Sequence, residues 1–255
     1  MLLFKLLFMP TLIWLATIAA RRWGNQVGGW IVGLPVMSAP ISIFLFIERG
    51  EAFAARAAIG SAAGILGAAA FALTYSRWAT STGWSRSLIY GLAGYGAAVV
   101  LLQIWDPGLT AGTLAVMTIF AVVLCLIPRR VVPNATEATP SWDLPLRMIV
   151  ATIVVVGLTT AAPLLGSTAV GLLSPVPVAT TVLCCFAHAQ SGGEAARQVL
   201  RGMVLSGFSF ATFFAIVALC LLPLGPTAYV LAAIGTGLVH CGVLTIDRRL
   251  WRTPG

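Results

Sequence analysis

The fold class of this chain is decided by the stretch Val27-Gly-Gly-Trp-Ile-Val-Gly-Leu-Pro35-Val-Met-Ser38-Ala-Pro40-Ile-Ser42-Ile-Phe-Leu-Phe-Ile47. It carries no charged side chain, and its length is close to the roughly 20 apolar residues that a helix needs to cross a bilayer. Pro35 and Pro40 each lack a backbone N–H and clash with the carbonyl four residues earlier. The stretch therefore predicts a membrane-spanning helix that is interrupted near its middle.

The composition of the whole chain supports the same class of protein. Of the 255 residues, 59% are hydrophobic and 9% are charged, and the mean hydropathy is +0.99. Soluble domains carry about a quarter charged residues, and a small soluble domain leaves a large part of its surface in water. The composition therefore excludes a soluble enzyme, a disordered chain and a DNA-binding domain, and it predicts an all-α integral membrane protein.

Apolar runs bounded by charged or turn residues predict about nine transmembrane helices. One long polar stretch, 128–145, contains four prolines and no helical period, so we expect an extended loop there. This loop separates the two halves of the chain. The predicted spans are 4–20, 27–47, 54–75, 87–105, 109–127, 146–165, 167–187, 198–222 and 226–246.

The basic residues are distributed unevenly between the two sides of the membrane that these spans define. Three of the 15 Lys and Arg residues, Lys5, Arg49 and Arg56, fall on the side of the N-terminus, and the other 12 fall on the opposite side. Cytoplasmic loops carry the excess of basic residues, so we expect the N-terminus outside and the C-terminus in the cytoplasm. The same placement accounts for the net charge of +8 without a nucleic-acid partner.

The second half of the chain repeats the first. A shift of 142 residues aligns 5–71 with 147–213 without a gap, so that Pro35 meets Pro177 and Gly50 meets Gly192. The matched proline and glycines favour a common origin over a chance alignment of Ala- and Gly-rich helices. Further identical pairs are Thr17/Thr159, Ala19/Ala161, Ala20/Ala162, Gly29/Gly171, Val36/Val178, Phe44/Phe186, Ala54/Ala196, Gly60/Gly202, Ala69/Ala211 and Phe71/Phe213, and Glu48 meets Gln190.

The position of the repeats predicts their orientation. They begin five spans apart, an odd number, so the second repeat crosses the membrane upside down relative to the first. We therefore expect two inverted-topology repeats (4+1+4) with Pro-interrupted second and seventh spans, an arrangement typical of secondary transporters. The expected units are 1–105, the first membrane repeat; 106–145, a connecting helix and cytoplasmic loop; and 146–255, the second membrane repeat.

The start of the second span also carries a family resemblance. Gly28-Gly29-Trp30-Ile31-Val32-Gly33-Leu34-Pro35, followed by Glu48-Arg49-Gly50 and by 52–60, resembles the small GlpM-type bacterial membrane proteins. Those proteins are about half as long, so this chain resembles two such units fused. The second unit has diverged, because Glu48-Arg49-Gly50 becomes Gln190-Ser191-Gly192. The resemblance implies a duplicated integral membrane protein and supplies no catalytic residues.

Candidate substrate-binding residues surround the two interruptions. The seventh span repeats the break as Ser174-Pro175-Val176-Pro177-Val178-Ala179-Thr180-Thr181. Paired broken helices in corresponding positions of two halves point to a transporter site, and half-helix N-termini with free N–H groups suit an anionic ligand. The candidate residues are Pro35, Ser38, Pro40, Ser42, Ser174, Pro175, Pro177, Thr180 and Thr181.

Other interpretations of these polar residues remain open. The prolines also fit plain kinks whose freed carbonyls bond Ser and Thr residues of neighbouring helices. Glu48 and Glu51 are possible ionisable site residues, because an ionisable group in a membrane is a functional hypothesis by default. Their place near the interface favours a solvated, mutually paired cluster with Arg49 and Arg56.

The sequence lacks the common motifs of catalysis. It contains no G-x-S-x-G, no H-E-x-x-H and no G-x-x-x-x-G-K-[ST]. Cys184 with His188, and His240 with Cys241, fit packing residues better than metal ligands. We therefore expect no enzyme activity, no cofactor and no metal.

The pattern as a whole favours a small secondary transporter or flippase of the bacterial inner membrane. Its partners would be the lipid bilayer and a small molecule or ion, with a small anion suited to the helix N-termini. Lys5 is the only lysine among 15 basic residues, which is typical of a GC-rich bacterial genome. The alternative is a non-transporting accessory or assembly protein, in which the prolines are only kinks.

Overall fold

The computed structural model describes residues 2–36, 38–104, 108–128, 142–161 and 177–250. The secondary structure within these ranges is helical throughout, which confirms the all-α fold class. The helices are α1 (Leu2–Trp23), α2 (Asn25–Gly33), α3 (Ser38–Arg49), α4 (Glu51–Trp78), α5 (Trp84–Ile104), α6 (Gly108–Leu126), α7 (Asp143–Ala161), α9 (Val178–Leu224) and α10 (Thr227–Leu250).

Several of these helices have the length and composition of membrane spans. Each of the nine predicted ranges contains helical residues in the part of the chain that is described. Five segments are long and apolar enough to cross a membrane, so the structure fits a membrane protein, and nine crossings stay a prediction. These segments are Asn25–Arg49, Glu51–Trp78, Trp84–Leu102, Val178–Leu224 and Thr227–Asp247.

The element α9 consists of two helices that meet at Gly192. The backbone of Gly192 has φ 81° and ψ 178°, a conformation that is open to glycine but costly for other residues. The thiol of Cys184 contacts the carbonyl oxygen of Ala196 at 3.8 Å, whereas 12 residues of continuous helix span about 18 Å. The segments 178–191 and 193–224 therefore fold back on each other.

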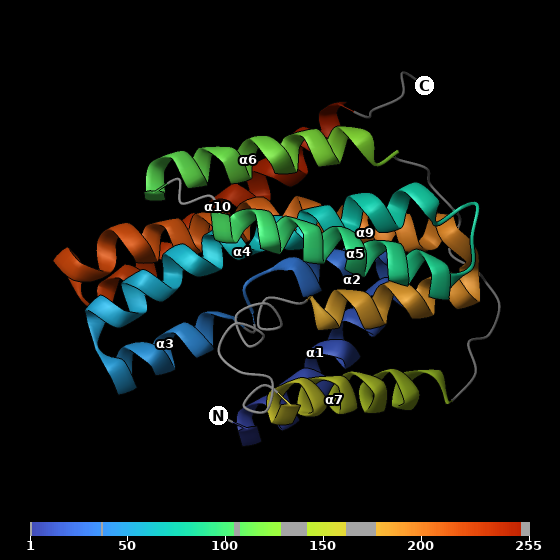
Figure 1. Ribbon diagram of the computed structural model, residues 1–255, viewed down its shortest axis with the longest axis horizontal. Coiled ribbons are helices and arrows are strands. Elements are labelled where there is room, and N and C mark those ends of the chain that lie inside the picture. Colours follow the sequence, from blue (N-terminus) through green and yellow to red (C-terminus); the bar gives the residue numbers. More distant parts are fainter. Residues whose placement is uncertain (1, 37, 105–107, 129–141, 162–176, 251–255) are drawn as a thin grey trace.

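Helix α9 is the central element of the bundle. It packs against α2, α4, α6, α7 and α10, while α4 also packs on α5 and α1 packs on α2 and α7. The long helices α4, α5, α6, α9 and α10 run side by side along the long axis of the molecule (Figure 1). This arrangement places α2, which ends at the first proline break, directly against α9.

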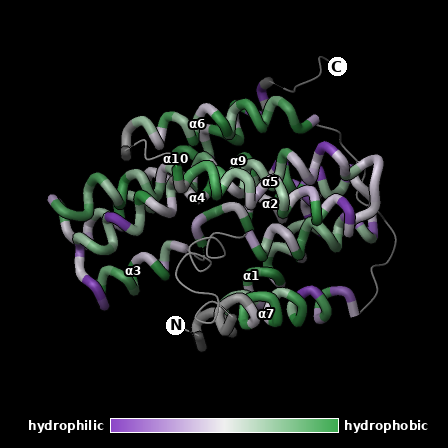
Figure 2. The backbone as a smooth tube through the Cα atoms, viewed as in Figure 1, coloured by the Kyte–Doolittle hydropathy of each residue, from purple (hydrophilic) through white to green (hydrophobic). Residues whose placement is uncertain are grey.

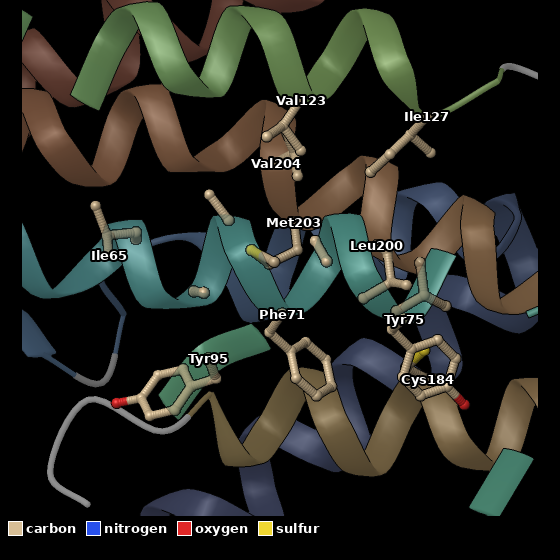
Figure 3. Packing of buried hydrophobic residues seen from close by; sticks show 14 of the residues in the cluster. Ile65, Phe71, Tyr75, Tyr95, Val123, Ile127, Cys184, Leu200, Met203 and Val204 are labelled. Carbon is tan, nitrogen blue, oxygen red and sulfur yellow. The ribbon is translucent and has the colours of Figure 1, made fainter. Parts of the chain in front are cut away.

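The largest core cluster joins α4, α6 and both parts of α9. Phe71 and Tyr75 of α4 are fully buried in this cluster. Figure 3 shows Tyr75 beside Cys184, which belongs to the first part of α9, and it shows Met203, which belongs to the second part, close to α4. Lipid is as apolar as these side chains, so close van der Waals packing stabilises such contacts more than the hydrophobic effect does.

The outer surface of the bundle is apolar as well. Leu101, Ile104 and Leu238 are 65%, 80% and 70% exposed. Hydrophobic colour extends over the outward-facing helices, and the hydrophilic segments lie mainly near helix ends (Figure 2). Soluble proteins rarely expose apolar surface on this scale, so the surface fits contact with lipid.

Candidate substrate site

The first predicted interruption is confirmed between α2 and α3. Helix α2 ends at Gly33 and α3 begins at Ser38, and the buried Pro35 lies between them. Leu34 is extended, with φ −69° and ψ 155°, as expected for a residue that precedes proline. Pro35 has no N–H to offer the carbonyl four residues earlier, so the helix cannot continue.

One carbonyl at this break is bonded by a serine that sequence reasoning missed. The carbonyl oxygen of Trp30 accepts hydrogen bonds from Leu34 N at 3.1 Å and from the hydroxyl of Ser206 at 2.8 Å. Ser206 is fully buried on α9. Its position four residues after Gly202 is the only sequence pattern that places it on the face toward α2. Because Leu34 N–H already bonds this carbonyl and Pro35 frees the carbonyl of Ile31, the Ser206 bond is an additional contact between α2 and α9.

Glycines bring the backbones of α2 and α9 into direct contact. A Cβ at Gly29 would collide with the carbonyl oxygen of Val199, and a Cβ at Gly202 would collide with the carbonyl oxygen of Gln26. A Cβ at Gly33 would lie 2.8 Å from the carbonyl oxygen of Met203. The G-x-x-x-G spacing of Gly29 and Gly33 therefore serves close helix packing.

The second interruption is described from Pro177 onward. Pro177 immediately precedes α9, whose first helical residue is Val178. Thr180 is buried, and the hydroxyl oxygen of Thr181 is buried without a hydrogen-bond partner. Ser174 and Pro175 lie outside the described residues, so their place in the site stays a prediction.

The structure brings the end of α2 and the start of α9 together. Val178, Ala179 and Val182 belong to one buried cluster with residues of α1 and α7. Ile31 and Val32, the last residues before Gly33, pack against the same cluster. The helix ends next to the two prolines therefore share one buried cluster.

Two candidates in α3 have other roles. Pro40 lies in the first turn of α3, where a backbone N–H has no partner within the helix, so it adds no second break. Its expected role in the interruption is therefore corrected. Ser42 is buried beside Tyr229 of α10, 3.1 Å from the phenol oxygen, and its carbonyl oxygen accepts the Tyr229 hydroxyl at 2.9 Å. Ser42 thus lies in the α3–α10 contact, among different neighbours from Thr180.

The possible ionisable residues lie at the turn between α3 and α4. Glu48 and Glu51 are exposed on the two sides of Gly50. The guanidinium carbon of Arg49 lies 5.7 Å from the ring centre of Phe53. This geometry agrees with the solvated interpretation and places both carboxylates at one end of the bundle.

A buried charge network lies near the Gly192 turn. Asp143 of α7 is fully buried and accepts hydrogen bonds from Arg21 at 2.8 Å and from Arg147 at 2.9 Å, and Gln190 donates to the same carboxylate. Arg147 also donates to Gln190 Oε1 at 2.8 Å and lies over Phe186. Burial raises the pKa of Asp143, but the hydrogen bonds and charge of Arg147 and the bonds from Arg21 and Gln190 outweigh it and hold the pKa below 3.8.

A second charge network joins α9 and α10 to the end of α6. Arg201 of α9 pairs with Asp247 of α10 at 2.6 Å, and both side chains are buried. The same guanidinium donates to the carbonyl oxygens of Leu124 at 2.9 Å and Ile127 at 2.8 Å. Buried charges need such complete pairing. The two networks connect α1, α6, α7, α9 and α10.

The Cys and His residues contact other side chains. His188 Nδ1 lies 3.1 Å from the hydroxyl of Tyr75, and that hydroxyl lies 3.9 Å from the sulfur of Cys185. Among the described residues, no group of three or more His, Cys, Asp or Glu side chains is placed to hold a metal ion.

Comparison of the chain with family models, with curated proteins and with solved structures finds no match. The resemblance to the GlpM-type proteins therefore stays a prediction.

Proposed function

We propose that this protein is a small secondary transporter or flippase whose substrate site lies between the α2–α3 break and the start of α9. The observation that carries the proposal is that Ile31 and Val32, just before Pro35, pack against the buried cluster that contains Val178, Ala179 and Val182, the residues that follow Pro177. Broken backbone inside a membrane is tolerated where it is buried in protein or lines a cavity. Paired breaks that meet near the midplane are the arrangement expected of a transporter site.

The geometry of the two halves supports the inverted-repeat architecture that we propose. Gly50 has φ 81° and ψ 175°, and its counterpart Gly192 has φ 81° and ψ 178°. Gly50 caps the start of α4, whereas Gly193 packs on the carbonyl of Ala79, just past the end of α4. The two equivalent turns therefore lie at opposite ends of one helix, as inversion requires. The 142-residue shift also carries α5 onto α10 and α1 onto α7.

The chemistry of the helix ends favours a small anionic substrate. Helices α3 and α9 both begin at the interruptions, where the positive end of each helix dipole lies. The first turn of α9 offers backbone N–H groups, whereas in α3 Pro40 has none and the N–H of Ala39 donates to the Pro35 carbonyl at 2.8 Å. Ser38 and Thr181 lie in the first turns of these helices, and the buried hydroxyl of Thr181 has no hydrogen-bond partner within the described residues. A ligand oxygen is the partner that these groups suit.

We propose a bacterial inner-membrane location with the C-terminus in the cytoplasm. Twelve of the 15 basic residues belong to the side that includes Arg21, Arg147 and Arg201, the residues of the two buried charge networks. A reporter active only in the cytoplasm should give activity when fused after residue 255. Activity from a fusion at residue 107, or none from the fusion after 255, would overturn this orientation.

Thiol labelling tests the site without knowledge of the substrate. Ser38→Cys and Thr180→Cys should react with a charged, membrane-impermeant methanethiosulfonate from both sides of the membrane, since a transporter exposes its site alternately. Modified positions are identified by mass spectrometry in right-side-out and inverted vesicles. The matched control is Ile234→Cys, a position 56% exposed on the outer surface of α10, which should stay unlabelled because it faces lipid.

The second candidate function is that of a non-transporting accessory membrane protein. The hydrogen bond from Ser206 to the Trp30 carbonyl favours it, because this bond holds the end of α2 to α9 without a ligand. In that case, neither Ser38→Cys nor Thr180→Cys would react from either side, and the transport proposal would be refuted.

A further inference from the structure

A line of polar groups runs between α2, α9 and α10 in the interior of the bundle. It begins at the Trp30 carbonyl, which accepts the Ser206 hydroxyl at 2.8 Å. One turn further along α9, the hydroxyl of Ser209 lies 3.3 Å from Nδ1 of His240 on α10. Ser206 and Ser209 are fully buried, and His240 is partly buried. An ionisable side chain in such a place is a functional hypothesis by default.

Trp30 connects His240 to the proline break. The rings of Trp30 and His240 meet edge to face, with centroids 6.2 Å apart and planes at 83°. The indole nitrogen of Trp30 is buried and has no hydrogen-bond partner among the described residues. Trp30 lies five residues before Pro35, and its own carbonyl bonds the last residue before that proline, Leu34. The Trp30 side chain therefore links a change in the charge of the His240 ring to the break at Pro35.

The charges near this line are already paired with each other. Within the described residues, α2 has no ionisable side chain, and the charged residues closest in sequence to Ser209 on α9 and to His240 on α10 are Arg201 and Asp247. These two form an ion pair at 2.6 Å. On α9, His188 and Arg197 contact Tyr75 and Ser76 of α4 instead.

On α10 itself, Tyr229 bonds Ser42, and Cys241 is exposed on the outer surface. His240 thus differs from its charged neighbours, because its contacts are a hydroxyl and an aromatic ring, both of which tolerate either charge state.

We propose that His240 binds the proton that couples this transporter to the proton gradient. The proposal rests on the proposed function and names its coupling ion. A neutral imidazole has one donor and one acceptor nitrogen, whereas the protonated ring has two donors. The Ser209 hydroxyl can donate to the neutral ring and accept from the charged one. A protonated ring is also attracted to the face of an indole, so proton uptake changes how Trp30 is held and with it the end of α2.

The first test is a titration of the full-length protein in micelles by nitrogen NMR. The chain has two histidines, so His188→Gln leaves His240 as the only imidazole. We expect the His240 ring to change protonation between about pH 5 and about pH 8, and the Trp30 indole resonance to move with the same midpoint. A His240 ring that keeps one charge state over this range overturns the proposal, whatever the labelling results are.

The second test connects the proton to the break. The labelling rate of Ser38→Cys should change several-fold across the same pH range, with the midpoint found for His240. Trp30→Phe should keep the His240 titration but reduce the pH effect on labelling, and His240→Gln should abolish that effect.

Ser209→Ala provides a variant that keeps the titrating group. It should retain pH-dependent labelling with a shifted midpoint. Labelling of Ser38→Cys from both sides that ignores pH overturns the proton site and leaves the transport proposal intact. Absence of labelling at every pH refutes the transport proposal, while the titration still reports on His240.

Discussion

The turns at Gly50 and Gly192 have nearly the same backbone and very different surroundings. Both glycines have φ 81°, with ψ 175° and 178°. Glu48 and Gln190, each two residues before its glycine, are both exposed, but Gln190 bonds Arg147 and the buried Asp143. The comparison teaches that a turn follows its own local sequence, while the rigidity of each end of the bundle depends on residues far away in the chain.

The largest effect should come from breaking the network at the Gly192 end. Asp143→Ala leaves Arg147, which is 5% exposed, without its carboxylate. Removing one partner of a buried ion pair costs about 3–5 kcal/mol. The free energy of unfolding should be measured by denaturant titration in micelles. Glu48→Ala is the control at the Gly50 end and should change it by less than about 0.5 kcal/mol. Equal losses for the two variants would contradict the comparison.

The next largest effect is a difference in stability between alanine substitutions at Gly202 and at Gly60, which occupy equivalent positions in the two repeats. Gly202→Ala places a Cβ against the carbonyl oxygen of Gln26, and such overpacking costs about 1–3 kcal/mol. Gly60 has open space around it, so Gly60→Ala should stabilise by about 0.5–1 kcal/mol through helix propensity. The same unfolding measurement gives both values. A stabilising Gly202→Ala would show that α2 and α9 do not touch as described.

The backbone conformation that Gly50 and Gly192 share predicts that substituting either glycine lowers the stability of the protein by a similar amount. Gly50→Ala and Gly192→Ala each force an L-residue into a region of positive φ and ψ near 180° that is almost restricted to glycine, which costs roughly 1–3 kcal/mol. Neither position has a neighbour within 4 Å of a Cβ, so sterics with other residues add nothing. Thermal unfolding in micelles should show losses of similar size. A loss at one turn and none at the other would remove the backbone argument for a repeat.

The smallest effect is the pH dependence of the network at the Gly192 end. The pKa of Asp143 is lower in the folded protein than its ordinary value of 3.8. Its contribution to stability is therefore complete above pH 3.8 and is lost as the pH falls through the folded value. The stability difference between the parent protein and Asp143→Asn should be constant near neutral pH and shrink in acid. A difference that grows on acidification would contradict the sign of this shift.

Local rules predicted the break at Pro35 and misjudged Pro40. Both prolines lack an N–H, but α3 begins at Ser38, so Pro40 occupies a first turn in which no helical bond is lost. The two prolines differ in effect because α3 begins at Ser38, and the start of α3 depends on where the Pro35 break ends. The exposure of Glu48 and Glu51 agrees with the solvated interpretation of the charged turn.

The partners of the buried polar groups were beyond sequence reasoning. Ser206 lies 176 residues from Trp30, and Tyr229 lies 187 residues from Ser42. No periodicity within one helix can indicate which residue of another helix it will face. The packing between helices therefore decided that Ser42 contacts Tyr229 of α10 instead of lying beside Thr180.

The sequence by itself determined the helical class, the break at Pro35 and the turn glycines, because each depends on the length of an apolar run or on the backbone of one residue. Only the tertiary structure decided that Asp143 joins Arg21 to Arg147, that Gly202 touches the backbone of α2, and that Trp30 meets His240. The physical reason is range. Backbone sterics and apolar length act within one turn or one span, whereas hydrogen bonds and close packing depend on which helices become neighbours.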